Sequence, residues 1–483
     1  MFGREPRLPS KRVMIDDLPS ELHERLRRHH QQHVVRWWDE LDAGQRRRLL
    51  SQIDAVDFDL IGRLLKGPPD RANAGMVVER ARHAMPPSEV VRLPGSPREA
   101  AAWAEAVRRG REVLAAGRVG VVLVAGGQAT RLAFPHPKGT YAIGPVSGCS
   151  LFQILAEQLV ARSRQAGAGI PYYLMTSEAT HDETIAFFAE HNHFGLNPDD
   201  VVFFQQGNMP AVDDDAGRLL LAEKGKLSTS PDGHGGLLAA LARAGLLDEM
   251  RSRGIEYLYY HQVDNPTAIV CDPAFVGFHV LRHSEMSTKV VAKRSPEERM
   301  GVVVGIDGQT QIVEYSDLPL EAARRRDEAG NLLLWAGNTA IHLFNRELLD
   351  RLTDEELGLP FHLAHKSVPH LNDAGEVLTP DEPNAYKFER FIFDALPHAA
   401  NALVVEADRA REFNPIKNAE GDDSPATAQA AMISIFKNWL RQAGVTVPDN
   451  VPVEISPLFA LDEADVKDKI AAGTSLSRPA YLQ

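Results

Sequence analysis

The segment with the clearest chemical potential is the run Val124-Ala125-Gly126-Gly127-Gln128, which follows the apolar residues Val121 to Leu123. Two glycines at the end of a strand let backbone N–H groups approach a phosphate, because no Cβ stands in the way. Arg131 and Lys138 follow in the same short loop, and their cations would balance phosphate charge. The spacing is neither G-x-G-x-x-G nor G-x-x-x-x-G-K-[ST], so it indicates a phosphate-binding loop of another kind. A tight turn with ordinary surface cations is the alternative.

Two further strand ends carry polar side chains. Asp264 follows the apolar run Tyr257 to Val263, where a carboxylate is well placed to hold Mg²⁺ against phosphate oxygens. Capping of a helix is the alternative role for Asp264. Gln206 follows the run Val201 to Gln205, and its amide offers both a donor and an acceptor to the edge of a nucleobase. A glutamine that caps a loop is the alternative.

A second glycine-rich segment, Gly233-His234-Gly235-Gly236, precedes a helical run. Its glycines would let the backbone pass close to a base or ribose, with the helix N-terminus nearby. His234 stands between them and offers an imidazole to the same place.

The composition limits the function classes. The 483 residues contain 66 acids against 53 bases, and the net charge of −13 argues against a nucleic-acid partner. An acidic chain that binds a nucleotide needs a locally positive pocket and a divalent cation. Two cysteines, Cys149 and Cys271, exclude a disulfide framework or a zinc cluster. Met1 to Arg12 is charged and no 18-residue apolar run occurs, so we expect a cytoplasmic chain without a membrane partner.

The elements that must position these residues alternate from Val119 onward. Strands are predicted at 121–124, 171–176, 201–205 and 257–263, and helices at 151–161, 181–191 and 237–244. This alternation indicates an α/β fold with a mostly parallel sheet flanked by helices. In such sheets ligands bind beyond the carboxyl ends of the strands. Antiparallel strands are predicted at 289–293, 302–306 and 311–315, with a turn at Asp307-Gly308.

Three regions are expected along the chain. Amphipathic spacing predicts two or three helices between Ser20 and Leu65, and another helix from Arg98 to Ala116. A helix from Ala426 to Ala443 and strands near 451–457 indicate a small α+β unit at the end. We therefore expect an N-terminal helical region at 1–95, a central catalytic domain at 96–405 and a C-terminal domain at 406–483.

The motifs together resemble those of a known family. The segments 124–132, 137–139 and 150–153 are similar to the eukaryotic-type UDP-sugar pyrophosphorylases (UDPGP type 1), and within them to the UDP-N-acetylhexosamine pyrophosphorylase group. The resemblance covers nearly the whole chain. Further motifs in the family's order lie at 203–207, 230–236, 263–265, 313–316, 337–338, 387–389 and 415–419.

The resemblance implies a Rossmann-like, GT-A-like nucleotidyltransferase fold and a Mg²⁺-dependent reaction, with Mn²⁺ as a substitute. UTP and a sugar 1-phosphate would give a UDP-sugar and pyrophosphate. It implies three catalytic cations, namely Arg131, Lys138 and Lys417. It implies nucleotide contacts at Ala125, Gly126, Gly127, Gln206 and Gly233, and a metal and nucleotide role for Asp264. It implies sugar contacts at His234, Glu314, Tyr315, Asn338, Phe391 and Phe393; without the resemblance, a core position is the favoured interpretation of each phenylalanine.

Three positions depart from the family pattern. His234 stands where the N-acetylhexosamine enzymes usually have Asn, and this Gly-His-Gly looks more like UDP-glucose or broad-specificity enzymes. Ala129 and Ala133 replace usual glycines in the phosphate loop. We expect the loop to tolerate Ala129. A methyl group at position 133 costs stability or reshapes the turn where the backbone needs φ > 0. N-acetylglucosamine or N-acetylgalactosamine 1-phosphate is the favoured acceptor, and glucose or galactose 1-phosphate is the alternative.

Two other functions make different demands on the sequence. A UDP-sugar sensor without turnover would not need the catalytic cations, and a Rossmann dehydrogenase would need the missing G-x-G-x-x-G motif. We expect a monomer or a weak homo-oligomer.

Overall fold

The computed structural model describes residues 18–66, 78–353 and 358–483, so the charged segment Met1 to Arg12 lies outside the described residues. The chain forms two compact units. A helical unit combines Met1–Ala72, Asn208–Gly233 and Phe361–Glu389, and a sheet unit combines Asn73–Gly207, His234–Pro360 and Arg390–Gln483. This division differs from the three consecutive regions expected from the sequence.

The helical unit owes its composition to a shared core. It contains the helices α1 (Ser20–Arg28), α2 (Ala43–Asp54) and α3 (Phe58–Lys66), and an antiparallel sheet of β15 (His362–Lys366), β18 (Ala385–Glu389) and β6 (Val212–Asp213). Leu26 and Trp38 share one buried cluster with Val212, Phe361 and Phe388. The N-terminal helices are amphipathic, and segments far along the chain supply the surface that buries their apolar faces.

The sheet unit is built on a mixed, mostly parallel sheet, which confirms the predicted fold class. Its main path runs β1 (Val90–Val91), β19 (Ala402–Glu406), β11 (Met286–Ala292), β14 (Ala336–Asn345), β10 (Tyr257–Gln262), β2 (Val119–Val124), β3 (Tyr172–Thr176) and β4 (Val201–Gln205). On this path only β14 runs antiparallel to its neighbours. The carboxyl ends of the seven other strands therefore lie along one edge.

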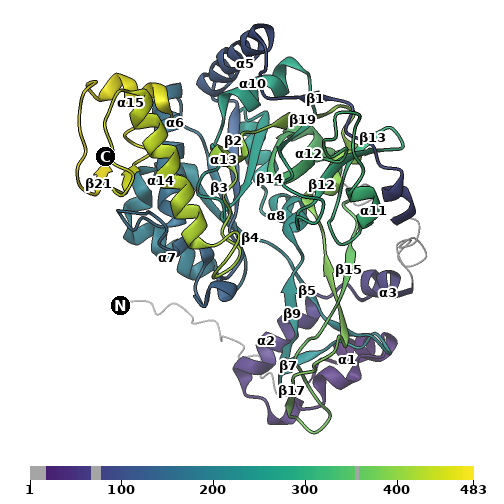
Figure 1. Ribbon diagram of the computed structural model, residues 1–483. Coiled ribbons are helices and arrows are strands. Elements are labelled where there is room, and N and C mark those ends of the chain that lie inside the picture. The colour runs from purple at the N-terminus through teal and green to yellow at the C-terminus, as the bar shows by residue number, and fades with distance from the viewer. Residues whose placement is uncertain (1–17, 67–77, 354–357) are drawn as a thin grey trace, which may run out of the picture. The chain divides into compact units, whose positions relative to one another are not determined.

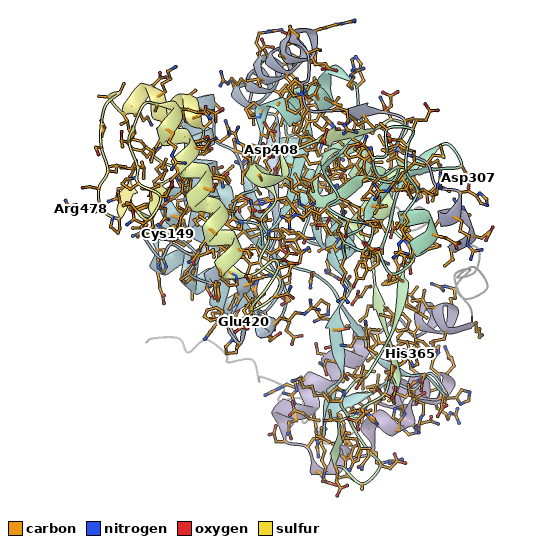
Figure 2. All side chains as sticks on the ribbon, viewed as in Figure 1. Cys149, Asp307, His365, Asp408, Glu420 and Arg478 are labelled. Carbon is orange, nitrogen blue, oxygen red and sulfur yellow. The ribbon has the colours of Figure 1, made fainter. Side chains whose placement is uncertain are left out.

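A branch joins this sheet through β12 (Val302–Ile306), which pairs antiparallel with β14 and with β13 (Gln309–Val313). The turn between β12 and β13 holds Asp307 at φ +53° and Gly308 at φ +79°, as the predicted Asp-Gly hairpin requires. Asp307 is labelled at this hairpin in Figure 2.

The two faces of the sheet are covered by different helices. Val121 and Leu123 of β2 belong to one buried cluster, and Val122 to the other, since alternate residues of a strand point to opposite faces. The first cluster includes residues of α6 (Leu151–Ala166) and α10 (Pro273–Leu281), and the second includes residues of α8 (Leu237–Arg243), α9 (Leu246–Ser252) and α12 (Arg346–Leu352). Two further helices of the sheet unit are α5 (Pro97–Ala115) and α7 (His181–Glu190).

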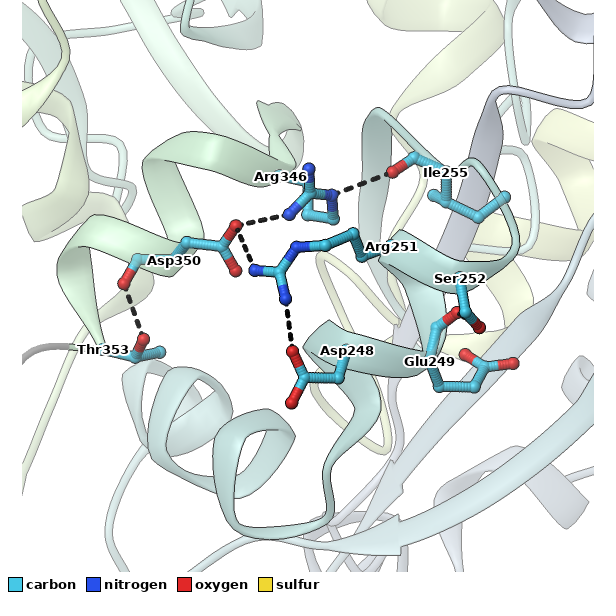
Figure 3. A network of polar contacts seen from close by, with 8 residues as sticks. All are labelled: Asp248, Glu249, Arg251, Ser252, Ile255, Arg346, Asp350 and Thr353. Atoms are coloured by element: carbon cyan, nitrogen blue, oxygen red, sulfur yellow. Dashed lines mark hydrogen bonds and ion pairs between the residues drawn. The ribbon is translucent and has the colours of Figure 1, made fainter.

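Polar contacts fasten α9 to α12 (Figure 3). Arg251 Nη2 lies 3.1 Å from Asp350 Oδ2, and Arg346 Nε donates to the carbonyl of Ile255 at 3.1 Å. Asp350 also pairs with Arg346 one turn away. These helices therefore form a fixed layer behind the sheet.

The C-terminal segment is part of the sheet unit (Figure 1). It contains α14 (Pro425–Gln442), α15 (Glu463–Lys469) and the parallel pair β20 (Val453–Ile455) and β21 (Ala480–Leu482). Ala428 and Met432 of α14 belong to the same buried cluster as the inner side of α6. Among the described residues, no helix is long and apolar enough to cross a membrane.

Candidate active site

The phosphate loop after β2 is closed by its own backbone. The Lys138 N–H donates to the carbonyl of Gly127 at 3.1 Å, and the Ala129 N–H donates to that of His136 at 3.1 Å. Ser177, at the end of the neighbouring β3, donates its hydroxyl to the Gly126 carbonyl at 2.7 Å. The loop is thus held at both ends, and its glycines stand at the carboxyl edge of the sheet.

The structure brings Lys138 and Asp264 together. Lys138 begins η4 (Lys138–Thr140), a 3₁₀ turn that packs closely against Phe152 of α6. The contact requires glycine at position 139, because a Cβ there would come within 2.2 Å of the Phe152 ring. Lys138 Nζ lies 4.0 Å from Asp264 Oδ2, and each of the two side chains is 17% exposed. A cation from the loop after β2 and a carboxylate just beyond the adjacent strand β10 are therefore close together in a half-buried place.

Arg131 is placed differently from Lys138. It lies on η3 (Thr130–Leu132) with an exposed side chain, and it forms no ion pair with any residue that the structure describes. Of the two departures in this loop, Ala129 has φ −88° and carries no left-handed strain, as expected. Ala133 has φ +52°, a conformation that costs an L-residue about 1–2 kcal/mol.

Gln206 lies directly against the phosphate loop. Its backbone N–H donates to the carbonyl of Thr176 at 2.9 Å, and a Cβ on Gly126 would stand 3.1 Å from Gln206 Nε2. The amide predicted to contact the base is therefore next to the glycine predicted to contact the phosphates. Gly233, the other nucleotide candidate, is the last residue of its segment of the helical unit, and its φ of +82° requires glycine.

His234 is held in one tautomer by the backbone of a neighbouring segment. The Ile392 N–H donates to His234 Nδ1 at 3.1 Å, so this nitrogen is unprotonated and the proton of the neutral ring is on Nε2. Gly235 explains why the two segments meet: its N–H donates to the Arg390 carbonyl at 2.8 Å, and a Cβ there would lie 2.7 Å from the Phe391 backbone.

The two phenylalanines of the sugar prediction pack on this histidine. The centroid of His234 lies 5.4 Å from that of Phe391 and 5.6 Å from that of Phe393. Phe393 is only 5% exposed and belongs to the core behind the sheet. Phe391 is half-buried and packs against the same core. Both therefore support the imidazole, and Phe391 keeps the greater exposure.

Glu314 and Asn338 meet through Gly301. The Asn338 N–H donates to the Gly301 carbonyl at 2.8 Å, and a Cβ on Gly301 would lie 2.9 Å from Glu314 Oε1. Tyr315 follows with a side chain that is 50% exposed. Strand β13 also packs against η8 (Ile392–His398), which carries Phe393. The predicted sugar residues thus belong to adjoining segments of the sheet unit.

A backbone hydrogen bond to Asp264 positions the segment that carries Lys417. The Ile416 N–H donates to the Asp264 carbonyl at 2.8 Å, so Lys417 follows immediately after a contact with the metal candidate. Its Nζ lies 3.9 Å from Asp423 Oδ2 and 5.6 Å from the centroid of the Phe413 ring.

Lys293 is a cation that we did not predict. It follows β11 at the same carboxyl edge of the sheet, and its N–H donates to the Trp335 carbonyl at 2.9 Å. It is 9% exposed, and burial lowers the pKa of its ammonium. The rule that singled out Asp264, a charged residue just beyond a strand, would have found it.

The residues fit the magnesium ion that the family resemblance implies. Among the described residues no three His, Cys, Asp or Glu side chains are grouped to hold a metal. Asp264 offers a half-buried carboxylate beside the phosphate loop. One carboxylate suffices in many nucleotide enzymes, because Mg²⁺ takes its other ligands from substrate phosphates and water.

Comparison with known proteins decides the family. The family described as UTP–glucose-1-phosphate uridylyltransferase matches residues 95–464. The chain belongs to this family. It is 38% identical over 445 residues to human UDP-N-acetylhexosamine pyrophosphorylase-like protein 1, covering 88% of this chain and 86% of that protein.

Two other relatives agree with this assignment. UDP-N-acetylglucosamine pyrophosphorylase of Saccharomyces cerevisiae is 39% identical, over 77% of this chain and 79% of its own. The solved structure of uridine diphosphate N-acetylglucosamine pyrophosphorylase from Trypanosoma brucei is 26% identical with a TM-score of 0.77, covering 94% and 95% of the two chains. The family resemblance and the enzyme class predicted from the motifs are confirmed: this family member is a uridylyltransferase.

Proposed function

We propose that this uridylyltransferase joins UTP to an N-acetylhexosamine 1-phosphate, giving the UDP-sugar and pyrophosphate in a Mg²⁺-dependent reaction. One arrangement carries the proposal: Lys138 and Asp264 face each other at 4.0 Å, and the segment before Lys417 is hydrogen-bonded to Asp264. Two cations and a carboxylate at one sheet edge suit the transfer of a group between phosphates.

The reaction needs no covalent protein intermediate. An oxygen of the sugar 1-phosphate attacks the α-phosphorus of UTP, and the bond from that phosphorus to the bridging oxygen breaks in line with it. The electron pair leaves with pyrophosphate, so negative charge grows on the β-phosphate. Lys138, with Arg131 from the same loop, binds this leaving group, and Lys417 neutralises the α-phosphate. Mg²⁺ on Asp264 would supply further charge neutralisation.

The nucleotide is oriented by the loop and by Gln206. The exposed Gly127 leaves its backbone open to phosphate oxygens, and the Gln206 amide beside Gly126 contacts the uracil edge. Such fixed contacts lower the barrier by pre-orienting the reacting atoms.

The sugar assignment follows the relatives, several of which are named for N-acetylated sugars. His234, Glu314 and Asn338 would recognise the sugar, with Phe391 and Tyr315 beside them. The histidine at position 234 favours the alternative acceptors, glucose or galactose 1-phosphate, because an imidazole is bulkier than a carboxamide. One such contact changes the discrimination between sugars by only about 1–3 kcal/mol. The similarity to relatives named for N-acetylated sugars therefore carries more weight in the assignment.

Release of pyrophosphate tests the proposal. Purified protein is incubated with UTP, Mg²⁺ and, separately, the 1-phosphates of N-acetylglucosamine, N-acetylgalactosamine, glucose and galactose. We expect release with at least one N-acetylated sugar and none without Mg²⁺. Binding of UTP without release for any sugar would instead support a UDP-sugar sensor.

A further inference from the structure

A buried polar junction joins the residues after β10 to the segment 410–416. Asn265 Nδ2 donates to the Glu412 carbonyl at 2.7 Å, and the Asn414 N–H donates to Asn265 Oδ1 at 3.2 Å. The Ile416 N–H completes the junction on the Asp264 carbonyl at 2.8 Å. Two chain segments about 150 residues apart are thus tied together beside the candidate active site.

Asn265 is suited to this place because both ends of its amide are used. Its Oδ1 also accepts the N–H of Thr267 at 3.2 Å and the hydroxyl of Thr267 at 3.0 Å. The side chain is buried, with only 4% of the residue exposed. Aspartate would lose the donor to Glu412, and an apolar residue would leave the surrounding N–H and C=O groups without partners.

A buried ion triad fixes the other side of the junction. Lys289 of β11 pairs with Glu412 of α13 (Arg409–Glu412), and its Nζ lies 2.7 Å from Oδ2 of Asp272, the cap of α10. Lys289 is 1% exposed and Glu412 is 8% exposed. Because a buried charge without its partner is costly, the triad holds α13 in one position against the sheet. Asp408, the cap of α13, is labelled in Figure 2.

Two of the candidate site residues adjoin this junction directly. Asp264 precedes Asn265, and Lys417 follows Ile416. The junction therefore fixes the backbone of Asp264 relative to that of Ile416, the residue before Lys417. Transfer reactions that depend on positioning can lose about 100-fold in rate for a displacement of about 1 Å.

We propose that Asn265 is a positioning residue for uridylyl transfer, which acts by holding Lys417 at a fixed place relative to Asp264. The inference rests on the roles that the proposed function gives to these two residues. It predicts that the contribution of Asn265 to kcat depends on the presence of the Lys417 ammonium. A residue that only stabilises the fold would act equally with and without that ammonium.

A double-mutant cycle tests this dependence. Asn265→Ala, Lys417→Ala and the double variant are compared with the wild type for kcat, for KM of both substrates, for UTP affinity by calorimetry and for Tm. We expect Asn265→Ala to lower kcat about 10- to 100-fold with a smaller change in KM. In the Lys417→Ala background the same change should lower kcat less than threefold. UTP affinity should change less than kcat, because the loop and Gln206 are untouched.

Asn401→Ala is the matched control. Asn401 Nδ2 also donates to a backbone carbonyl, that of Arg282 at 2.8 Å, but it precedes β19 at the opposite edge of the sheet. We expect its kcat to stay within twofold of the wild type, whatever its Tm. A loss as large as that of Asn265→Ala would overturn the proposal.

Two further results would overturn it: an unchanged kcat in Asn265→Ala, or an equal fold loss in both backgrounds. If Asn265→Ala does not fold, Thr267→Val replaces it. This removes one donor to Asn265 Oδ1 and the hydroxyl that accepts from Asn414 Nδ2, both within the junction, and leaves the Asn265 amide in place. A loss of kcat of at least threefold that vanishes in the Lys417→Ala background supports the proposal, and an unchanged kcat contradicts it. Failure of the proposed function is a different result, because the wild type itself would then be inactive.

Discussion

Lys138 Nζ, in the loop that follows β2, lies 4.0 Å from Oδ2 of Asp264, which follows the adjacent strand β10. The pair is half-buried, so each charge partly neutralises the other in a place of reduced dielectric. Phosphate oxygens would compete for the ammonium, and a divalent cation would compete for the carboxylate. We therefore expect the Lys138 ammonium to bind the leaving pyrophosphate and the Asp264 carboxylate to bind the metal.

Loss of the loop cation should slow turnover. We expect Lys138→Met to lower kcat about 100-fold, because a charge that stabilises the leaving group in the transition state is removed. The measurement is steady-state pyrophosphate release at saturating UTP. Lys226→Met, which removes a lysine paired with Glu223 in the helical unit, is the control and should keep its activity. A kcat within twofold of the wild type for Lys138→Met would refute this role.

His234 should influence the choice of sugar. Replacement by Asn retains an oxygen that can accept the Ile392 N–H, now bound by Nδ1 at 3.1 Å, and it removes part of the ring that packs on Phe391. We expect His234→Asn to shift the kcat/KM ratio toward N-acetylglucosamine 1-phosphate by about 5- to 100-fold. Glucose 1-phosphate is the reference substrate. An unchanged ratio would show that position 234 does not face the acetamido group.

A substitution at Gly127 should weaken UTP binding without lowering the stability of the fold. A Cβ on this residue would meet nothing within 4 Å, and its φ does not lie in the left-handed region. Gly127→Ala should therefore keep its Tm within a few degrees but weaken UTP binding about 10-fold or more, since a methyl group would stand between the backbone and the phosphate. Calorimetric titration with UTP is the measurement.

The contrasting control is Gly235→Ala. Its Cβ would lie 2.7 Å from backbone atoms of Arg390 and Phe391, so it should lower Tm as well. If Gly127→Ala bound UTP as tightly as the wild type, the phosphates would not pass over this part of the loop.

The sequence predicted the core of the fold because apolar runs and their breaks were clear. The strands ending at Val124, Thr176 and Gln205 are confirmed to the last residue. The long strand β14 and the helix α10 were not predicted. Strand β14 contains Gly337, Asn338 and His342, which break an alternating pattern, and α10 is apolar on all sides because both its faces are buried.

The candidate site was predictable where a residue follows a strand. Asp264, Gln206 and the glycine loop were identified in that way, and the structure brings them to one edge. Lys293 was missed because no motif marked it, although it also follows a strand. The helices between Ser20 and Leu65 were predicted, but the full extent of the helical unit was not, because its core joins segments that only the folded chain brings together, such as Trp38 and Phe388.

Buried histidines should make the fold sensitive to acid. Burial lowers the pKa of His261 to about 3, that of His279 to about 4 and that of His342 to about 3. Below the unfolded pKa of about 6.5 the unfolded chain binds more protons than the folded one, so stability is full above that pH and declines below it. We expect the free energy of unfolding to fall by about 4 kcal/mol between pH 7.5 and 5.5.

Urea denaturation at a series of pH values measures this decline. His342→Phe should reduce the slope by about one third, because neither ring nitrogen of His342 has a hydrogen-bond partner among the described residues and its removal breaks no hydrogen bond. A free energy of unfolding that stays constant from pH 7.5 to 5.5 would contradict the buried, neutral state of these rings.

The acceptor preference tests whether this uridylyltransferase acts on an N-acetylhexosamine 1-phosphate. The measurement is the ratio of kcat/KM for N-acetylglucosamine 1-phosphate to that for glucose 1-phosphate, with UTP and Mg²⁺ at saturation. We expect UDP-sugar and pyrophosphate in equal amounts and a ratio above about 10, the equivalent of about 1.4 kcal/mol. A ratio below one, or UTP binding without product from either sugar, would contradict it.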